Sequence, residues 1–276
     1  MRRVRTVVEA DEVLAVLDVR SIARINALPG SQRARVYRSL LPSDVLSRFN
    51  ITLTLSDGYA DSPRFCVDPR TASVSLALRH TVDAEDPLVY IELADTVTGQ
   101  IEVLLFVVND PNSERFDTDR LSDGTPTHFG TVRRNISEEM RAMEAGLAPG
   151  QVRRGLQMTR DLIPCLEQFV AGLHHDVFYI QPLAYHNAIM FERLGFSYML
   201  GLGRMEWIQK EFAPGGLLHG RLDGSTPFRP RGADRSVRGR SWAIHDGIMG
   251  MPYEGIKMYK QIGIHAGLAT FPGAAW

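Results

Sequence analysis

Seven histidine and aspartate residues of this chain could bind a metal ion or transfer protons. They form two groups, the consecutive His174, His175 and Asp176, and the widely spaced His219, His245, Asp246 and His265. Imidazole and carboxylate groups are common zinc ligands, and histidine titrates near neutral pH. Consecutive side chains on a strand point to opposite faces, so the first group is expected not to share one ion. The second group has no recognised ligand spacing and needs the fold to bring its members together.

Arginine side chains could bind an anion in two stretches of the chain. Arg153 and Arg154 stand directly before Gly155, and six more arginines lie between residues 221 and 240. Guanidinium groups form paired hydrogen bonds with phosphate and carboxylate groups. The simpler interpretation of both stretches is a solvated surface. The alternatives are a site for an anionic substrate or a contact with a partner subunit.

The hydrophobic pattern predicts the helices and strands that must position these residues. Asn135 and Glu138 form a capping box. Pro29, Gly146 and Gly195 stand where helices are expected to end. Helical spacing of apolar residues predicts helices at about 11–28, 32–41, 136–145, 151–173 and 185–194, the fourth of them interrupted at Pro164. Runs rich in β-branched and apolar residues predict strands at about 51–55, 73–79, 88–94, 101–108, 176–181, 196–200 and 204–208.

Two β-hairpins are expected among these strands. Leu88–Ala94 and Ile101–Val108 flank a turn that contains Thr98 and Gly99. The second of these runs is almost continuously apolar, which predicts a central strand that is buried on both faces. The strands at 196–200 and 204–208 are expected to form the other hairpin.

The stretch from Ile101 to Ile208 resembles the core of the GNAT N-acyltransferase superfamily. The expected order of elements is strand, strand, helix, strand, helix and hairpin, and the strongest local match is VFYIQPLAYHNAIMFERLGFSYM. The family's helix ends in the pattern Tyr-Glu-x-Leu-Gly-Phe, which reads Phe-Glu-Arg-Leu-Gly-Phe over 191–196 here. Gly195 permits the left-handed residue that stops a helix. Phe196 then returns to the core as the next strand begins.

The resemblance implies a binding site for acyl-coenzyme A, with acetyl-CoA or another acyl-CoA as co-substrate. In the family, a Gln/Arg-x-x-Gly-x-Gly/Ala loop at a helix N-terminus binds the pyrophosphate, and strand backbone binds the pantetheine. The residues that the resemblance assigns to these roles are Leu105, Val107, Val108, Gln151, Arg153, Arg154 and Gly155. The chain departs from the loop pattern, because Val152 replaces the Gln/Arg and Gln157 replaces the second small residue.

The resemblance also suggests catalytic residues. Many family members use a tyrosine of the last helix to protonate the departing thiolate, and Phe191 occupies its place here. Tyr185 and His186 begin the same helix about one and a half turns earlier and are candidates to replace it. Glu102 or His186 is the candidate base that deprotonates the amine, which requires hydrogen-bond reach to the nucleophile.

Length, charge and cysteine content limit the class of protein. The 276 residues carry a formal net charge of −1, so no global charge favours nucleic acid or an anionic membrane. No run approaches the roughly 20 apolar residues of a membrane span, and acidic residues interrupt the N-terminal apolar stretch, unlike a signal peptide. Cys66 and Cys165 are the two cysteines, which excludes a disulfide framework or a cysteine zinc site and favours a reducing, cytoplasmic environment.

The sequence therefore predicts an α/β protein with a mixed central sheet flanked by helices. We expect a GNAT-like domain over residues 1–210 and an irregular, glycine-rich C-terminal extension over 211–276. The extension is too apolar for a free linker and should pack on the core or on another protomer, so a homodimer is possible.

The expected function is transfer of an acyl group from acyl-CoA to an unknown amine, with a small-molecule acceptor and no metal. One alternative is a non-catalytic or repurposed GNAT-fold protein that binds another ligand. Another is a metal-assisted enzyme that uses the histidines of the C-terminal segment.

Overall fold

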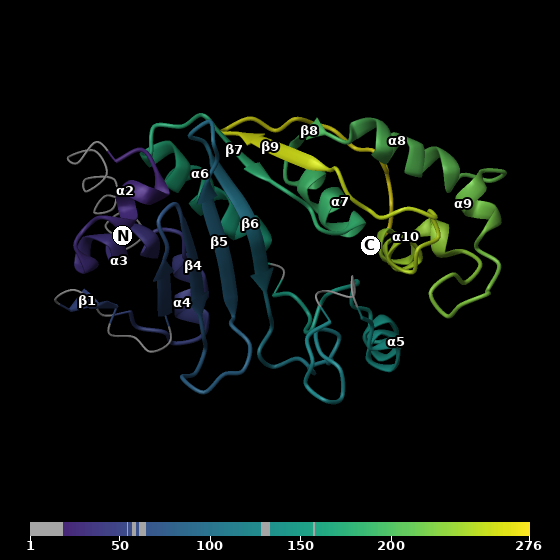
Figure 1. Cartoon of the computed structure of the whole chain (residues 1–276), viewed down its shortest axis with the longest axis horizontal. Coiled ribbons are helices and arrows are strands. Elements are labelled where there is room, and N and C mark those ends of the chain that lie inside the picture. Colours follow the sequence, from purple (N-terminus) through teal and green to yellow (C-terminus); the bar gives the residue numbers. More distant parts are fainter. Residues whose placement is uncertain (1–18, 54, 57–58, 61–64, 128–132, 157) are drawn as a thin grey trace. The chain divides into compact units, whose positions relative to one another are not determined.

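The computed structural model describes residues 19–53, 55–56, 59–60, 65–127, 133–156 and 158–276. The chain is an α/β protein with a mixed seven-stranded sheet flanked by helices (Figure 1). The strands of this sheet are β3 (Phe65–Pro69), β4 (Ser73–Leu78), β5 (Val89–Asp95), β6 (Ile101–Val108), β7 (Val177–Ile180), β8 (Ser197–Leu200) and β9 (Lys257–Gln261). They are ordered β3-β4-β5-β6-β7-β9-β8. A separate two-stranded sheet pairs β1 (Leu55–Ser56) with β2 (Tyr59–Ala60).

The helices precede, connect and follow these strands. They are α2 (Ile22–Asn26), α3 (Gly30–Arg38), α4 (Ser43–Arg48), α5 (Ile136–Glu144), α6 (Thr159–Gly172), α7 (Tyr185–Arg193), α8 (Leu202–Glu211), α9 (Leu217–Gly220), the 3-10 turn η1 (Ala233–Arg235) and α10 (Val237–His245). None of the described helices combines the length and apolar character that crossing a membrane requires.

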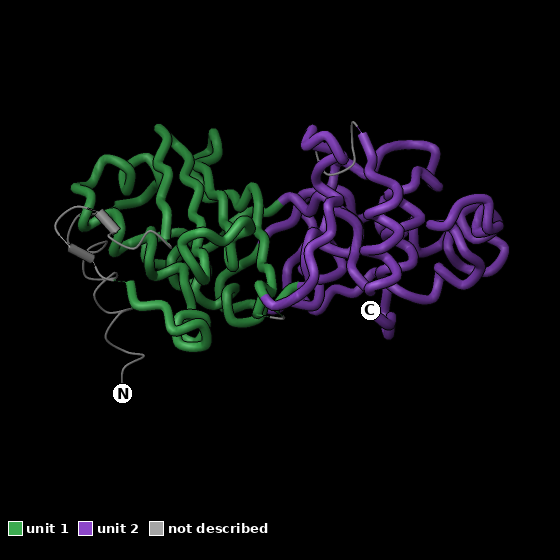
Figure 2. Tube along the Cα trace, turned by 90° about the horizontal axis from the view of Figure 1, so that it is seen from below, with its two compact units in different colours: residues 1–111, 155–180, 260–264 green, residues 112–154, 181–259, 265–276 purple. Residues whose placement is uncertain are grey.

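The chain divides into two compact units, which Figure 2 shows in different colours. Unit 1 comprises residues 1–111, 155–180 and 260–264, and unit 2 comprises 112–154, 181–259 and 265–276. The division does not follow the expected boundary at residue 210. Instead, each unit is assembled from segments that are far apart in the sequence.

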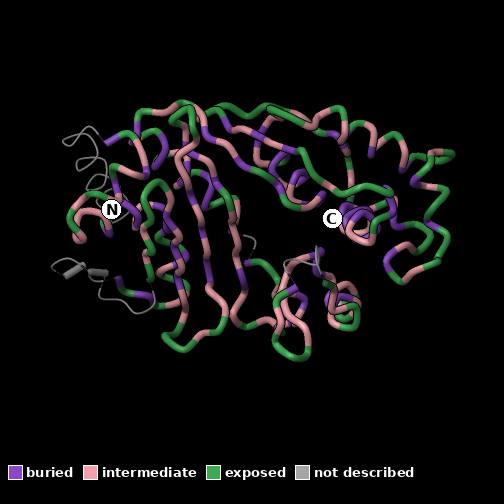
Figure 3. Tube along the Cα trace, viewed as in Figure 1, coloured by how far each residue is buried: buried purple, intermediate pink, exposed green. Residues whose placement is uncertain are grey.

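The antiparallel strands β3 to β6 form the framework of unit 1. Buried and partly exposed positions alternate along β4, where Val74, Leu76 and Leu78 are buried (Figure 3). The expected hairpin of β5 and β6 is confirmed, and Gly99 has the positive φ of 85° that its turn requires. The carboxylate of Asp95 accepts hydrogen bonds from the first N–H groups of α2, at 2.8 Å and 2.9 Å, and so caps this short helix against the sheet.

Strand β6 differs from its expected environment in its second half. The register with β5 shifts between Val103 and Leu105, so Leu104 is an extra residue in the ladder. Parallel pairing with β7 covers only Ile101–Val103. Leu104 is 39% exposed and the residues from 105 to 108 are half-buried, so the prediction of burial on both faces is wrong. The greater exposure of β6 begins directly after the residue where its pairing with β7 ends.

Unit 2 contains α5 and the helices from α7 to α10. The expected hairpin over 196–208 is wrong, because residues 204–208 belong to α8 and β8 pairs with β9 instead. Met205, Ile208 and Phe212 are all fully buried and follow helical spacing. The five residues 204–208 alone fit the apolar spacing of a strand as well as that of a helix. Phe212 continues the helical spacing beyond this stretch and identifies the segment as a helix.

Other predicted boundaries also change. The strand expected at 51–55 is wrong for residues 51–53, which form no regular element, and residue 54 lies outside the described residues. The expected helix over 11–28 is described only as α2, since 11–18 lie outside the described residues. The helix expected from 151 begins at Thr159, and α6 continues through Pro164.

The helix α5 keeps its predicted cap, and its buried face carries a carboxylate. The Asn135 side chain accepts a hydrogen bond from the N–H of Glu138, and Gly146 follows the helix with a φ of 86°. Ile136 is exposed, however, whereas Glu139 and Ala142 are buried. The carboxylate of Glu139 tolerates burial because charged partners surround it.

The residues after 211 are more regular than expected. They form α9, η1, α10 and β9, and their large apolar side chains are mostly buried. The fully or nearly fully buried members include Trp242, Ile244, Ile248, Met249, Ile256 and Met258.

Candidate functional site

The residues predicted to form one acyl-CoA site fall into both compact units. Unit 1 contains Glu102, Leu105, Val107, Val108 and Gly155. Unit 2 contains Gln151, Arg153, Arg154, Tyr185 and His186. A single site that includes both groups therefore remains a prediction.

Tyr185 belongs to the interior of unit 2. Its side chain is 1% exposed and meets the ring of Tyr253 edge-on, with ring centroids 6.5 Å apart. Burial raises the pKa of Tyr185 to about 12, although the neighbouring charge of Arg240 opposes the rise. The phenol is protonated at neutral pH but covered by protein, so it is not positioned to protonate a departing thiolate.

His186 is buried in the same unit. Its Nδ1 lies 2.9 Å from the hydroxyl oxygen of Ser241 on α10, and its side chain is 5% exposed. Burial lowers the pKa of His186 to about 3, and the nearby His245 adds to the shift. The imidazole is therefore neutral at pH 7. Its hydrogen bond joins α7 to α10, which is a structural contact.

The motif at the end of α7 is held by a buried carboxylate. Glu192 accepts hydrogen bonds from the hydroxyl of Tyr198 at 2.6 Å and from the backbone N–H and hydroxyl of Thr270 at 2.9 Å and 2.6 Å. Phe191 and Phe196 pack with ring centroids 5.1 Å apart. Within unit 2, the Phe-Glu-Arg-Leu-Gly-Phe sequence thus fixes α7, β8 and the C-terminal segment to one another.

The loop expected to bind pyrophosphate is held by backbone hydrogen bonds within unit 2. Gln151 accepts from the N–H of Ala148 through its side chain. Arg153 donates to the carbonyl of Ser113 at 2.5 Å, and Arg154 donates to the carbonyl of Ala145 at 2.9 Å. Residues 151–156 are not a helix N-terminus, so the expected geometry is wrong at this position. Residue 157 lies outside the described residues.

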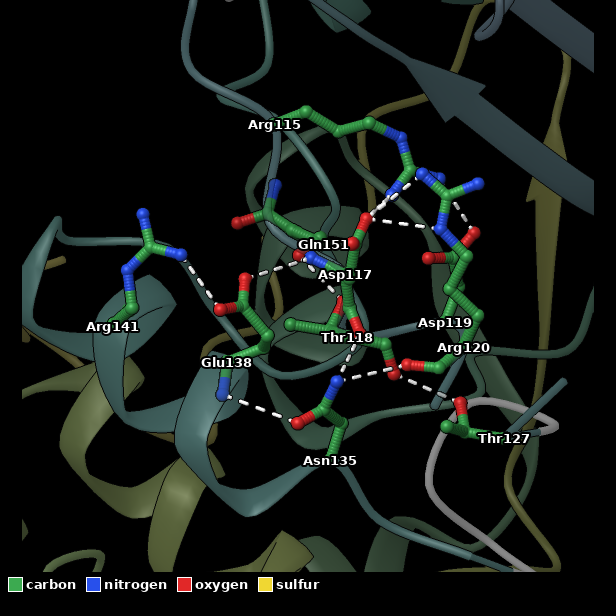
Figure 4. Close-up of polar contacts among 10 residues, drawn as sticks. All are labelled: Arg115, Asp117, Thr118, Asp119, Arg120, Thr127, Asn135, Glu138, Arg141 and Gln151. Atoms are coloured by element: carbon green, nitrogen blue, oxygen red, sulfur yellow. Dashed lines mark hydrogen bonds and ion pairs between the residues drawn. The ribbon is translucent and has the colours of Figure 1, made fainter. Parts of the chain in front are cut away.

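A polar network holds the neighbouring loop 113–127, as Figure 4 shows. The Asn135 amide donates to the carbonyls of Asp117 and Arg120 at 3.1 Å and 2.9 Å. Glu138 accepts from the N–H of Asp117, and Thr118 donates to the carbonyl of Gln151. The capping-box residues therefore also anchor this loop, a role that their local sequence does not indicate.

The members of the predicted site in unit 1 lie along β6 and beside its end. Leu105, Val107 and Val108 follow the last residue that pairs with β7. A Cβ on Gly155 would lie 3.5 Å from the carbonyl oxygen of Val108, so the chain passes close to the strand end just before α6. Glu102 is half-buried and lies within the paired part of β6.

A charged cluster connects α5 and α10 and was not anticipated from the sequence. Arg134 donates to Glu139 and Asp246, and Arg229 donates to Asp246 at 2.7 Å. Nε2 of His245 lies 3.2 Å from Glu139. Burial raises the pKa of Glu139, but hydrogen bonds from His245 and Arg134 outweigh burial and hold the pKa below its usual range. The cluster stabilises ionised carboxylates between the two helices.

The histidines of the C-terminal segment have separate surroundings in unit 2. His245 contacts Glu139, and Nδ1 of His265 accepts from the N–H of Gly267 at 3.1 Å. Over the described parts of the chain, no three His, Cys, Asp or Glu side chains are arranged to hold a metal ion.

Comparison with known proteins adds no relative. Neither protein-family models, curated proteins nor solved structures match this chain. The resemblance to the GNAT superfamily therefore depends on the sequence of the chain itself.

Proposed function

We propose that this protein is a divergent GNAT-type N-acyltransferase that transfers an acyl group from acyl-CoA to a small amine. The observation that carries the proposal is the short parallel pairing of β6 with β7. The pairing ends at Val103 and Ile180, whereas β6 continues to Val108. This is the stretch that the resemblance assigns to pantetheine.

A strand edge of this kind suits an extended ligand that contains amide groups. Backbone N–H and C=O groups beyond a short neighbouring strand can pair with another extended chain. Pantetheine has two amides, whose N–H and C=O groups can pair with the part of β6 that extends beyond β7. The extra residue at Leu104 changes the twist of β6 at the start of this stretch and supports such a role.

The start of α6 suits the pyrophosphate at the end of the same strand. Gly155 lies beside the carbonyl of Val108, and α6 begins four residues later at Thr159. The N–H groups of Thr159 and Arg160 belong to the first turn, which has no earlier helical carbonyls to bond. Such groups and the helix dipole favour an anion. This assignment replaces Arg153 and Arg154, whose guanidinium groups donate to loop carbonyls.

Glu102 is the candidate base in this proposal, because Tyr185 and His186 are buried. The base accepts a proton from the amine as its nitrogen bonds to the thioester carbonyl carbon. The carbon–sulfur bond then breaks, and the released thiolate takes up a proton. Glu102 lies on β6, three residues before the strand segment assigned to pantetheine.

Release of free thiol from acetyl-CoA in the presence of amines tests this assignment. We expect Glu102→Gln to lower kcat by about 10²-fold or more, with little change in coenzyme A affinity. The matched control is Glu206→Gln, which alters an exposed glutamate on α8. Equal activity of the two variants would remove Glu102 from the mechanism.

The second candidate is a GNAT-fold protein that binds a ligand without acyl transfer. The burial of both Tyr185 and His186 favours it, because neither residue can replace the family's tyrosine. Saturable coenzyme A binding without thiol release across primary amines, amino acids and aminoglycosides would favour this candidate over the enzyme.

A further inference from the structure

A pocket of about 390 Å³ lies within unit 2, between the end of α5 and the start of α10. Its volume falls in the range of small-molecule sites. Its lining includes Glu144, Leu147, Phe228, Arg231, Arg238 and Trp242. The pocket belongs to unit 2 alone and is independent of the acyl-CoA site proposed on β6.

The lining of the pocket includes two aromatic side chains that stack on each other. Phe228 and Trp242 are both buried and stack with ring centroids 5.3 Å apart and an angle of 23° between the rings. The indole N–H of Trp242 donates to the carbonyl of Leu147 at 2.9 Å, which fixes the orientation of the ring. A fixed and mostly apolar lining favours a ligand with an apolar body.

The rim of the pocket carries an excess of positive charge. Arg231 is exposed, and Arg238 donates to the carbonyl of Gly146. Within the described residues, neither guanidinium forms an ion pair with a carboxylate, in contrast to Arg134 and Arg229 in the same unit. Glu144 is the one acidic residue of the lining.

We propose that this pocket binds a small aromatic carboxylate. The apolar part of the lining receives the aromatic body, and the guanidinium groups of Arg231 and Arg238 attract the carboxylate. Glu144 repels an anion, so the two arginines must outweigh one carboxylate.

Fluorescence of Trp242 gives a direct binding assay. The variant Trp207→Phe/Trp276→Phe leaves Trp242 as the remaining tryptophan, and neither replaced residue lines the pocket. We expect 3-phenylpropionate to change the emission of Trp242 saturably. The neutral 3-phenylpropanamide, which has nearly the same shape, should bind at least about fivefold more weakly because it lacks the charge.

Two substitutions that change the charge of the pocket in opposite directions distinguish an electrostatic role of these side chains from a structural role. In this background, Arg231→Gln should weaken 3-phenylpropionate binding about two- to fivefold, and Glu144→Gln should strengthen it by a similar factor. Neither should alter binding of the amide. Arg235→Gln is the control, since it removes an exposed arginine that does not line the pocket.

The proposal is overturned if Trp242 emission does not respond to millimolar 3-phenylpropionate. Equal binding of the acid and the amide would also overturn it. So would an Arg231→Gln variant that binds the acid as tightly as the Arg235→Gln control.

Discussion

Individual side chains in unit 2 show how burial limits the chemistry that a local sequence suggests. The sequence around Tyr185 and His186 suggests acid–base chemistry, but both side chains are buried and join α7 to other parts of unit 2. Burial depends on which segments pack over a residue, and the local sequence does not contain that information. The same limit applies to Glu139, whose charged partners lie before α5 and at the end of α10.

The buried imidazole of His186 predicts a pH dependence of stability. Its folded-state pKa is lowered from 6.5 to about 3, so the unfolded state binds the proton first as the pH falls. Its contribution to stability is complete above pH 6.5 and is lost progressively as the pH falls toward 3. The Tm should therefore fall between pH 7 and pH 5, before most carboxylates titrate.

His186→Phe tests this origin of the pH dependence. This variant removes the titrating group and should have a flatter Tm between pH 7 and pH 5, whatever its absolute stability. An unchanged slope would contradict this assignment and attribute the pH dependence to another group.

Glu192 predicts a large stability effect for a residue that sequence reasoning would assign to the surface. Replacing it with glutamine weakens three hydrogen bonds that now end on a buried carboxylate. We expect Glu192→Gln to lower the free energy of unfolding by about 1–3 kcal/mol in urea titrations. Glu206→Gln, on the exposed face of α8, should change it by less than about 0.5 kcal/mol. Similar values for the two variants would contradict the structural role of Glu192.

At the scale of elements, turn and cap signals were more reliable than short apolar runs. The hairpin around Gly99, the Asn135 cap and the helix stop at Gly195 were all predicted, because each depends on local backbone geometry. The strand expected at 204–208 was wrong, because the packing of Met205, Ile208 and Phe212 decides that the segment is helical. The displaced start of α6 likewise follows from contacts of 151–154 with a distant loop.

The helix stop at Gly195 allows a matched test. Its φ is 84°, and a Cβ there would lie 2.8 Å from the ring of His265 and 2.9 Å from its Cα. Gly99 has a similar φ of 85° but nothing within 4 Å of its Cβ position. Gly195→Ala should therefore lower the free energy of unfolding by at least about 1 kcal/mol more than Gly99→Ala. If urea titrations gave equal losses of unfolding free energy for the two variants, the positive φ alone would explain why glycine occupies position 195.

At the scale of the whole molecule, sequence reasoning predicted the fold class but not the division of the chain. The mixed sheet flanked by helices is confirmed. Each compact unit combines three segments, and β9 begins in unit 2 and ends in unit 1. Such an assembly depends on long-range strand pairing, which a boundary drawn along the sequence cannot represent.

The central proposal is that β6 and the start of α6 bind acyl-CoA, and calorimetric titration with acetyl-CoA tests it most directly. We expect micromolar binding, equivalent to about −8 kcal/mol. Gly155→Leu should weaken it at least about tenfold, since its side chain would extend beside the end of β6. Gly203→Leu, in open space on α8, should not. No detectable binding at millimolar acetyl-CoA, or equal affinity of the two variants, would contradict the account.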